Sequence, residues 1–262
     1  YFYFLKIIMK FKFLPLLTLF FLGMNPFLYS QSENVYPQSG GYWLAYFGDN
    51  KINSRFGIHS EAQARNFGVD QSVSTLLLRV GLNTYINPNT MFTVGYGYIY
   101  GDPTSDDVIA SNTSENRIWQ QLILRNKTRN IFLEHRFRLE QRFIENKTAG
   151  TNQTDHRVRY RFQTIFPLYS IDPYLRHWFV ALNNEIMINL KDEPADLFDR
   201  NRFFIGIGYQ VSPKMNFQLG YMNQFAQVKG RPKGHTDNLI QFSVSYNMDD
   251  LMQTFFNSKT EK

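Results

Sequence analysis

Arginine and glutamate recur at every second position in the middle of this chain, the pattern most suggestive of chemistry. The residues of this pattern are Arg117, Arg125, Glu134, Arg136, Arg138, Glu140, Arg142, Arg157, Arg159, Arg161, Glu185 and Arg202. Nearer the N-terminus, the positions with the same spacing are Arg55, His59, Glu61, Arg65 and Arg79. Because side chains of a β-strand alternate between its two faces, each row lies on one face. Guanidinium groups bind carboxylates and phosphates bidentately, so the rows predict ion pairs or an anion site.

Two interpretations of these rows remain open. The interior of a narrow β-barrel is filled by side chains, so the rows could form a ladder of Arg–Glu pairs that plugs a lumen. Alternatively, the excess of twelve arginines over four glutamates could attract phosphate, carboxylate or acidic sugar groups into a narrow anion-preferring channel.

Few residues of the chain are suited to catalysis. The chain has no cysteine, which excludes disulfides, thiolate zinc sites and a cysteine nucleophile. His59 and Glu61 could perform acid–base chemistry, although a hydrogen-bonded lumen histidine is the commoner arrangement. His135 and His156 fall on the parity opposite the arginines. Candidates in the proposed external loops are His235, Asp237 and the acidic segment 102–107. A barrel-embedded hydrolase or lipid-modifying enzyme is therefore a third alternative, and we expect no catalytic residue among the lumen rows, no metal and no cofactor.

Period-two alternation continues through the chain after residue 31 and predicts the elements that position these side chains. Eleven strand-like segments follow one another at 41–48, 54–66, 72–87, 90–100, 115–127, 130–144, 154–168, 176–190, 199–211, 214–228 and 237–248. Strands of soluble proteins usually have about 5–6 residues, whereas a tilted membrane-spanning strand needs about 9–11. No stretch has a helical period. We predict an all-β fold, an antiparallel up-and-down transmembrane β-barrel.

The alternation of apolar and polar residues along each segment bears on the choice between a membrane barrel and a soluble one. Phe203, Ile205 and Ile207 alternate with Arg202 and Gly206 in one segment. A lipocalin-like barrel or a sandwich would alternate in the same way, with the apolar face inside. An export signal, the long strands and aromatic residues at the ends of the apolar faces favour the membrane version. These aromatic residues are Tyr42, Tyr98, Tyr100, Trp178, Tyr209 and Tyr246.

Connections between the segments alternate in length, which predicts the topology. The tight ones lie near 49–53, 88–89, 128–129 and 212–213, with 169–175 a moderate exception. The longer ones are 67–71, 101–114, 145–153, 191–198 and 229–236. Outer-membrane barrels have short periplasmic turns, longer external loops and an even number of strands. We therefore predict twelve strands, with an extra one within 33–39, or ten if the first segment lies outside the wall.

The first thirty residues predict an export signal. Met9 precedes the basic residues Lys10 and Lys12, an apolar core at 13–22 and a polar exit ending at Ser30. This is the layout of a secretory signal peptide, so we expect Met9 to be the true start. The predicted regions are a removed signal at 1–30 and one β-barrel domain at 31–262. A membrane-anchoring helix is the alternative, but this stretch is short and interrupted by proline and glycine.

The net charge of +6 gives little support for nucleic-acid binding, because three of the lysines lie in the predicted signal. An aromatic content of 17% with a mean hydropathy of −0.36 is unusual for a cytosolic enzyme. It is typical of strands that face lipid on one side and water on the other.

Motifs along the chain resemble Domain of Unknown Function 2490 (DUF2490), a family of Bacteroidota. They lie at 117–122, 132–143, 155–161, 181–185 and 219–224, and the resemblance extends from 41 to 248. It implies an exported protein of the bacterial cell outer membrane, a β-barrel whose biochemical role is not established, and it supplies no catalytic residues. The expected partners are outer-membrane lipid and lipopolysaccharide, the barrel-insertion machinery and a small anionic solute, but no nucleic acid. The tail 249–262 departs from outer-membrane barrels generally, which often end on an aromatic residue.

Overall fold

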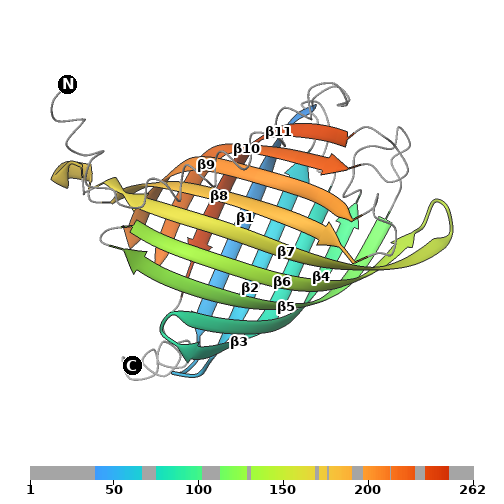
Figure 1. The fold of residues 1–262 in the computed structure, drawn as a ribbon, viewed down its shortest axis with the longest axis horizontal. Coiled ribbons are helices and arrows are strands. Elements are labelled where there is room, and N and C mark those ends of the chain that lie inside the picture. Colours follow the sequence, from blue (N-terminus) through green and yellow to red (C-terminus); the bar gives the residue numbers. More distant parts are fainter. Residues whose placement is uncertain are drawn as a thin grey trace, which may run out of the picture.

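The computed structural model is a closed β-barrel of strongly tilted strands (Figure 1). It describes residues 39–66, 75–101, 113–128, 131–168, 171–175, 177–190, 197–212, 214–227 and 234–247. Several predictions lie outside these residues: the signal at 1–30, the acidic segment 102–107, the tail 249–262 and all but the last residue of 33–39. Among the described residues, no helix is long and apolar enough to cross a membrane.

Eleven strands form the wall of the barrel. They are β1 (Ser39–Lys51), β2 (Phe56–Asn66), β3 (Thr75–Asn87), β4 (Thr90–Gly101), β5 (Thr113–Thr128), β6 (Ile131–Asn146), β7 (Thr151–Pro167), β8 (Trp178–Asn189), β9 (Phe198–Ser212), β10 (Met215–Gln227) and β11 (Gly234–Tyr246). A short 3-10 helix, η2 (Pro173–Leu175), lies between β7 and β8. Each predicted segment coincides with one strand, because alternating polar and apolar side chains suit a wall with two different faces.

The barrel closes through a parallel pair, which corrects the predicted strand count. Ten neighbouring pairs are antiparallel, but β1 pairs with β11 in parallel, from Ser39 opposite Asp237 to Gly48 opposite Tyr246. An odd number of strands can close only if the first and last run in the same direction. The structure therefore does not confirm a count of twelve or of ten. The described strands number eleven, and the β1–β11 pair leaves this sheet without an edge for another strand.

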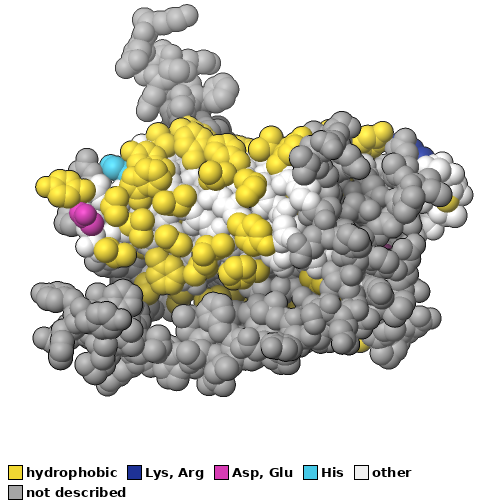
Figure 2. Space-filling view, turned by 90° about the horizontal axis from the view of Figure 1, so that it is seen from above, with side chains coloured by type: hydrophobic (Ala, Val, Ile, Leu, Met, Phe, Trp, Pro, Cys, Tyr) yellow, Lys and Arg dark blue, Asp and Glu magenta, His cyan; other side chains and the backbone are white. Residues whose placement is uncertain are grey.

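The two faces of the wall differ sharply in polarity. In β3, four outward residues (Leu76, Leu78, Val80 and Leu82) are 50–59% exposed, whereas Arg79 between them is buried. Figure 2 shows hydrophobic side chains gathered over the outer surface of the wall. The inner face instead holds most of the buried charged residues. The parity predicted from the sequence is therefore the parity of the barrel.

The connections divide the barrel into two different ends. At one end of the barrel, here called the short-turn end, consecutive strands are separated in the sequence by 52–55, 88–89, 129–130, 168–177 and 213–214. At the opposite, long-loop end, the longer separations are 67–74, 102–112, 190–197 and 228–233. The loop predicted at 145–153 is instead the tight turn 147–150, because β6 and β7 continue further than predicted. This hairpin reaches beyond its neighbours (Figure 1).

A tryptophan on a floor of glycines helps to position the charged inner face. Trp119 of β5 is completely buried, and its indole lies against Gly81 and Gly95, which face each other on β3 and β4. A Cβ atom at Gly95 would collide with the indole and with the backbone oxygen of Val80. The absence of side chains at these two positions therefore makes room for the indole. The Arg138 guanidinium lies over this ring, 4.8 Å from its centre.

Candidate functional site in the barrel lumen

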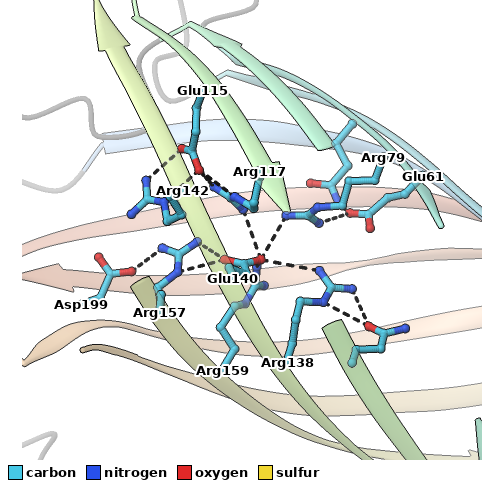
Figure 3. Close-up of polar contacts among 12 residues, drawn as sticks. Glu61, Arg79, Glu115, Arg117, Arg138, Glu140, Arg142, Arg157, Arg159 and Asp199 are labelled. Atoms are coloured by element: carbon cyan, nitrogen blue, oxygen red, sulfur yellow. Dashed lines mark hydrogen bonds and ion pairs between the residues drawn. The ribbon is translucent and has the colours of Figure 1, made fainter. Parts of the chain in front are cut away.

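The carboxylate of Glu140 in β6 is the centre of a buried ion-pair network (Figure 3). Its side chain is inaccessible to solvent. Glu140 Oε2 accepts hydrogen bonds from Arg157 Nε and Nη2 at 3.1 and 2.7 Å, and Oε1 accepts one from Arg159 Nη1 at 2.8 Å. Arg117 Nη1 and Arg79 Nη2 donate to Oε1 at 3.2 and 3.4 Å. The many donors offset the cost of removing this carboxylate from water.

The ion pairs around Glu140 extend across the lumen. Arg79 Nη1 also binds Glu61 Oε1 of β2 at 2.7 Å. Arg157 Nη1 also binds Asp199 Oδ2 of β9 at 2.5 Å. The connected series Glu61, Arg79, Glu140, Arg157 and Asp199 therefore joins β2, β3, β6, β7 and β9. Since these strands stand on different sides of the closed barrel, the series crosses the lumen at this level.

A second layer lies toward the long-loop end. Glu115 accepts two hydrogen bonds at 2.9 Å from the Nε and Nη2 atoms of Arg142, and a third at 2.7 Å from Arg117 Nε. Asp199 Oδ2 also accepts one from Arg200 Nε at 3.3 Å. All five side chains are buried. This layer is continuous with the Glu140 network, because Arg117 binds both Glu115 and Glu140.

A third carboxylate, Glu185 of β8, extends the network toward the short-turn end. Its oxygens accept hydrogen bonds from Arg136 Nη2 at 2.5 Å and from Arg159 Nε and Nη2 at 3.1 and 2.7 Å. Arg202 Nη1 lies 3.8 Å from the same carboxylate. The Arg202 guanidinium also lies over the ring of Trp43, 4.8 Å from its centre.

A separate triplet lies nearer the short-turn end. Glu134 accepts hydrogen bonds from Arg125 Nε at 3.0 Å and from Arg161 Nη2 at 2.6 Å. The Arg125 side chain is 41% exposed, so this triplet is partly solvated. Arg55, which the sequence placed inward, is instead exposed in the β1–β2 turn. The expected strand began at 54, whereas β2 begins at Phe56.

The structure places all twelve proposed lumen residues on the inner side of the wall, where each makes an ion pair. Nine of them belong to the Glu140 network. Arg125, Glu134 and Arg161 form the separate triplet. Which arginine meets which carboxylate across the lumen, such as Arg79 and Glu140, depends on tertiary structure.

Three network residues escaped the sequence analysis: Glu115, Asp199 and Arg200. Glu115 has the parity of Arg117 but lay at the predicted start of its strand. Asp199 and Arg200 are both buried although they are consecutive. The β8–β9 register shifts at this point, so that Met187 pairs with Arg200 and Ile188 with Phe198. A bulge leaves one residue unpaired and redirects its neighbours, which strict alternation does not reveal.

Four arginines of β6 and β7 form a cluster of like charge. In the register of these strands, Arg136 lies directly opposite Arg161, and Arg138 lies directly opposite Arg159. We call these four residues the arginine square. Like charges in directly opposed positions destabilise a sheet. Carboxylates accept hydrogen bonds from three members. The hydrogen bonds of Arg138 go instead to the neutral Gln121 Oε1, at 3.1 and 2.7 Å, and its ion pair with Glu140 is longer, at 3.9 Å.

A cavity of about 490 Å³ lies between the arginine square and the short-turn end. Its lining includes nine lysine and arginine residues but only four aspartates and glutamates. Among the residues that the structure describes, six cavity-lining side chains have a buried polar atom with no hydrogen-bond partner. Five of these atoms are donors: Trp43 Nε1, Arg79 Nε, Arg136 Nε, Arg138 Nη1 and Arg161 Nε. The sixth is an acceptor, Gln241 Oε1. The cavity therefore offers positive charge and N–H donors in excess.

The histidine considered for acid–base chemistry is held between two acids. His59 is buried, with Nδ1 2.8 Å from Asp49 Oδ1 and Nε2 3.5 Å from Glu61 Oε2. Glu61 is itself paired with Arg79. His135 instead contacts the Tyr160 hydroxyl at 2.9 Å, outside the arginine rows. No group of three or more potential metal ligands occurs within the described parts of the chain.

Comparisons with known proteins give a family match and a similar structure. A family model described as "Protein of unknown function (DUF2490)" matches residues 40–235, from β1 into β11. No curated protein matches the sequence. A solved structure described as "NanC porin structure in rhombohedral crystal form" is similar at 11% sequence identity, with a TM-score of 0.48. That similarity covers 79% of this chain and 96% of the other.

Proposed function

We propose, on the premise that this chain belongs to the DUF2490 family of proteins of unknown function, that it is a β-barrel of the bacterial outer membrane with an occluded lumen. The outer face of the wall carries this proposal. Exposed large hydrophobic residues occur on all eleven strands, including Leu44, Val94, Phe137, Ile207 and Ile240. Soluble monomers rarely expose continuous apolar patches larger than a few hundred Å². In a bilayer this surface would meet acyl chains, while the closed sheet satisfies its own backbone.

The Glu140 network supports a structural role for the lumen. Its ion pairs cross the barrel and are buried, so they act as a plug that fixes the distance between opposite walls. The proposed partners of the outer surface are membrane lipid, lipopolysaccharide and, during assembly, the barrel-insertion machinery.

A narrow anion-preferring channel is the second candidate function. The observation in its favour is the excess of buried positive charge, ten arginines against seven carboxylates. Such an excess attracts anions and repels cations in a confined lumen. Conduction would require the Glu140 network to be hydrated or to move, and planar-bilayer recordings distinguish this candidate from a permanent plug.

We expect the mature protein to start near Gln31 and to be recovered from cells only with detergent. Its apolar outer face requires lipid or detergent, and its closed sheet should keep it folded in unheated electrophoresis samples. The measurement combines membrane fractionation, N-terminal sequencing and comparison of gel mobility before and after heating. Recovery of the mature chain in the soluble fraction without detergent would contradict the membrane location.

The two ends of the barrel predict a labelling pattern. Epitope tags at 106 or 149 should be accessible on intact cells, and tags at 128 or 213 should not. The physical reason is that the end of such a barrel with the longer loops faces outside, whereas the short-turn end faces the periplasm. Position 149 lies in the tight β6–β7 turn, at the end opposite to 128 and 213. Permeabilised cells, in which all four tags should react, provide the control. The reverse pattern would overturn the orientation and leave the barrel itself intact.

A further inference from the structure

We propose that the cavity beside the arginine square binds a small organic anion, with a carboxylate or phosphate held by Arg136, Arg138 and Arg161. The inference goes beyond an occluded membrane barrel, because it assigns a ligand class to one half of the lumen. It rests on the proposed function only for the barrel itself. The site would be present whether or not the lumen conducts.

The arginine square concentrates positive charge beside the cavity. Each of its two opposed pairs brings like charges together, which requires nearby negative charge. Arg136 and Arg159 share Glu185, and Arg161 binds Glu134. Arg138 has no comparable partner: its Nη1 atom lies 3.9 Å from the Glu140 carboxylate, which already binds other arginines. A ligand carboxylate or phosphate would give Arg138 an anionic partner at hydrogen-bond distance, which Glu140 at 3.9 Å is not.

Buried hydrogen-bond donors outnumber acceptors around the cavity. Arg136 Nε, Arg138 Nη1 and Arg161 Nε are buried donors without a partner among the described residues, and all three residues line the cavity. Buried N–H groups of charged side chains are costly to leave unpaired. Carboxylate and phosphate oxygens are acceptors that match guanidinium geometry. A cation or a ligand rich in donors would leave this imbalance uncorrected.

The opposite wall of the cavity indicates that the ligand has an uncharged body. The lining residues that β10 and β11 contribute carry no charge, and include Gln218, Met222, Gln241 and Ser243. Gln241 Oε1 is a buried acceptor without a partner, so the body should carry a hydroxyl or N–H donor. A volume of about 490 Å³ lies in the range of small-molecule pockets. An inorganic ion alone would contact only the arginine side.

The test measures ligand binding to the folded barrel in detergent. The chain has three tryptophans, of which Trp43 lines the cavity and Trp119 lies beneath Arg138. In a Trp178→Phe background, fluorescence therefore reports on the lumen. The probes are gluconate and glucose 6-phosphate, with glucose as the neutral control and inorganic phosphate as the anion without a body. We expect saturable changes with gluconate and glucose 6-phosphate, and none with glucose.

Arg138→Gln should weaken binding of both organic anions at least about tenfold, the effect of losing one charged hydrogen bond. Arg142→Gln is the matched control: it removes the same charge from the lumen, does not line the cavity, and leaves Glu115 bound to Arg117. It should keep its affinity. Heat-dependent gel mobility verifies folding of each variant. If Arg138→Gln does not fold, Arg136→Gln replaces it, since Glu185 then keeps Arg159.

Three outcomes would overturn the site. One is that the folded barrel binds neither gluconate nor glucose 6-phosphate at concentrations up to about 10 mM. Another is equal loss of affinity in the Arg138 and Arg142 variants, which would indicate that the total positive charge of the lumen, not a specific site, attracts the anion. The third is binding of inorganic phosphate as tight as that of glucose 6-phosphate, which would show that the organic part of the ligand contributes nothing to the affinity. All three leave the membrane barrel standing, because that proposal fails on solubility and gel mobility instead.

Discussion

Replacing Glu140 with alanine is expected to lower the free energy of unfolding by about 3–5 kcal/mol, the usual cost of removing one partner from a buried ion-pair network. The side chain is fully buried and accepts hydrogen bonds from four arginines of three different strands. Without it, these guanidinium groups lose their shared carboxylate in a region with little water. The measurement is equilibrium unfolding of the barrel in detergent or vesicles, followed by gel mobility.

Two further variants isolate the charge and the burial. Glu140→Gln keeps the shape of the side chain and should destabilise the barrel nearly as much, because the charge is the missing element. Glu134→Ala is the matched control. Its carboxylate is 19% exposed and binds the half-exposed Arg125, so its loss should cost only about 1 kcal/mol. A loss for Glu140→Ala no larger than for Glu134→Ala would mean that the lumen is hydrated.

Single-channel recordings of Glu140→Ala separate the plug from the pore. A dry plug predicts a large loss of stability and no conductance by the unmodified protein. A hydrated lumen predicts a smaller loss of stability and a change in anion preference. If neither stability nor selectivity changes, Glu140 does not lie in a shared network of the lumen.

Val80→Arg should destabilise the folded barrel in lipid by about 2–4 kcal/mol, the cost of an arginine near the bilayer midplane of such a barrel. Val80 lies in the middle of β3, points outward and is 52% exposed. In a soluble barrel the same change would place a charge in water and have little effect. Reversible unfolding in vesicles provides the measurement.

Ile86→Arg is the control for this substitution, because the same strand presents it close to one end. Ile86 is also strongly exposed, at 62%, but lies beside the short β3–β4 turn. An arginine there can place its guanidinium at the membrane–water interface, so we expect the free energy of unfolding to fall by only about 0–1 kcal/mol. Equal costs at the two positions would argue against a lipid-facing belt.

The strands and the polarity of their faces could be predicted because period two is a local property of sequence. In β6 and β7, the polarity of a residue and of its neighbours two positions away indicates which face of the strand its side chain occupies. The charged inner row was predictable for the same reason. The way in which the barrel closes was not predictable. An even number of strands was assumed, and nothing in the local sequence of β1 specifies that Ser39 pairs in parallel with Asp237, 198 residues away.

Other features of the site depend on three-dimensional arrangement. The bulge at Asp199 and Arg200 breaks the alternation on which the prediction relied. The cavity is lined by residues from all eleven strands, a combination that no single strand reveals. The position of Arg138 over Trp119 likewise requires the paired glycines of two other strands.

The parallel pair between β1 and β11 also implies an order of assembly. Every other pair joins consecutive strands, so it can form as a hairpin soon after its two strands meet. The β1–β11 seam must instead close a loop of nearly the whole barrel, with a larger entropic cost. Parallel ladders are also slightly less stable per residue than antiparallel ones. We therefore expect the seam to form last during folding, and to be the line along which the barrel first separates when it unfolds.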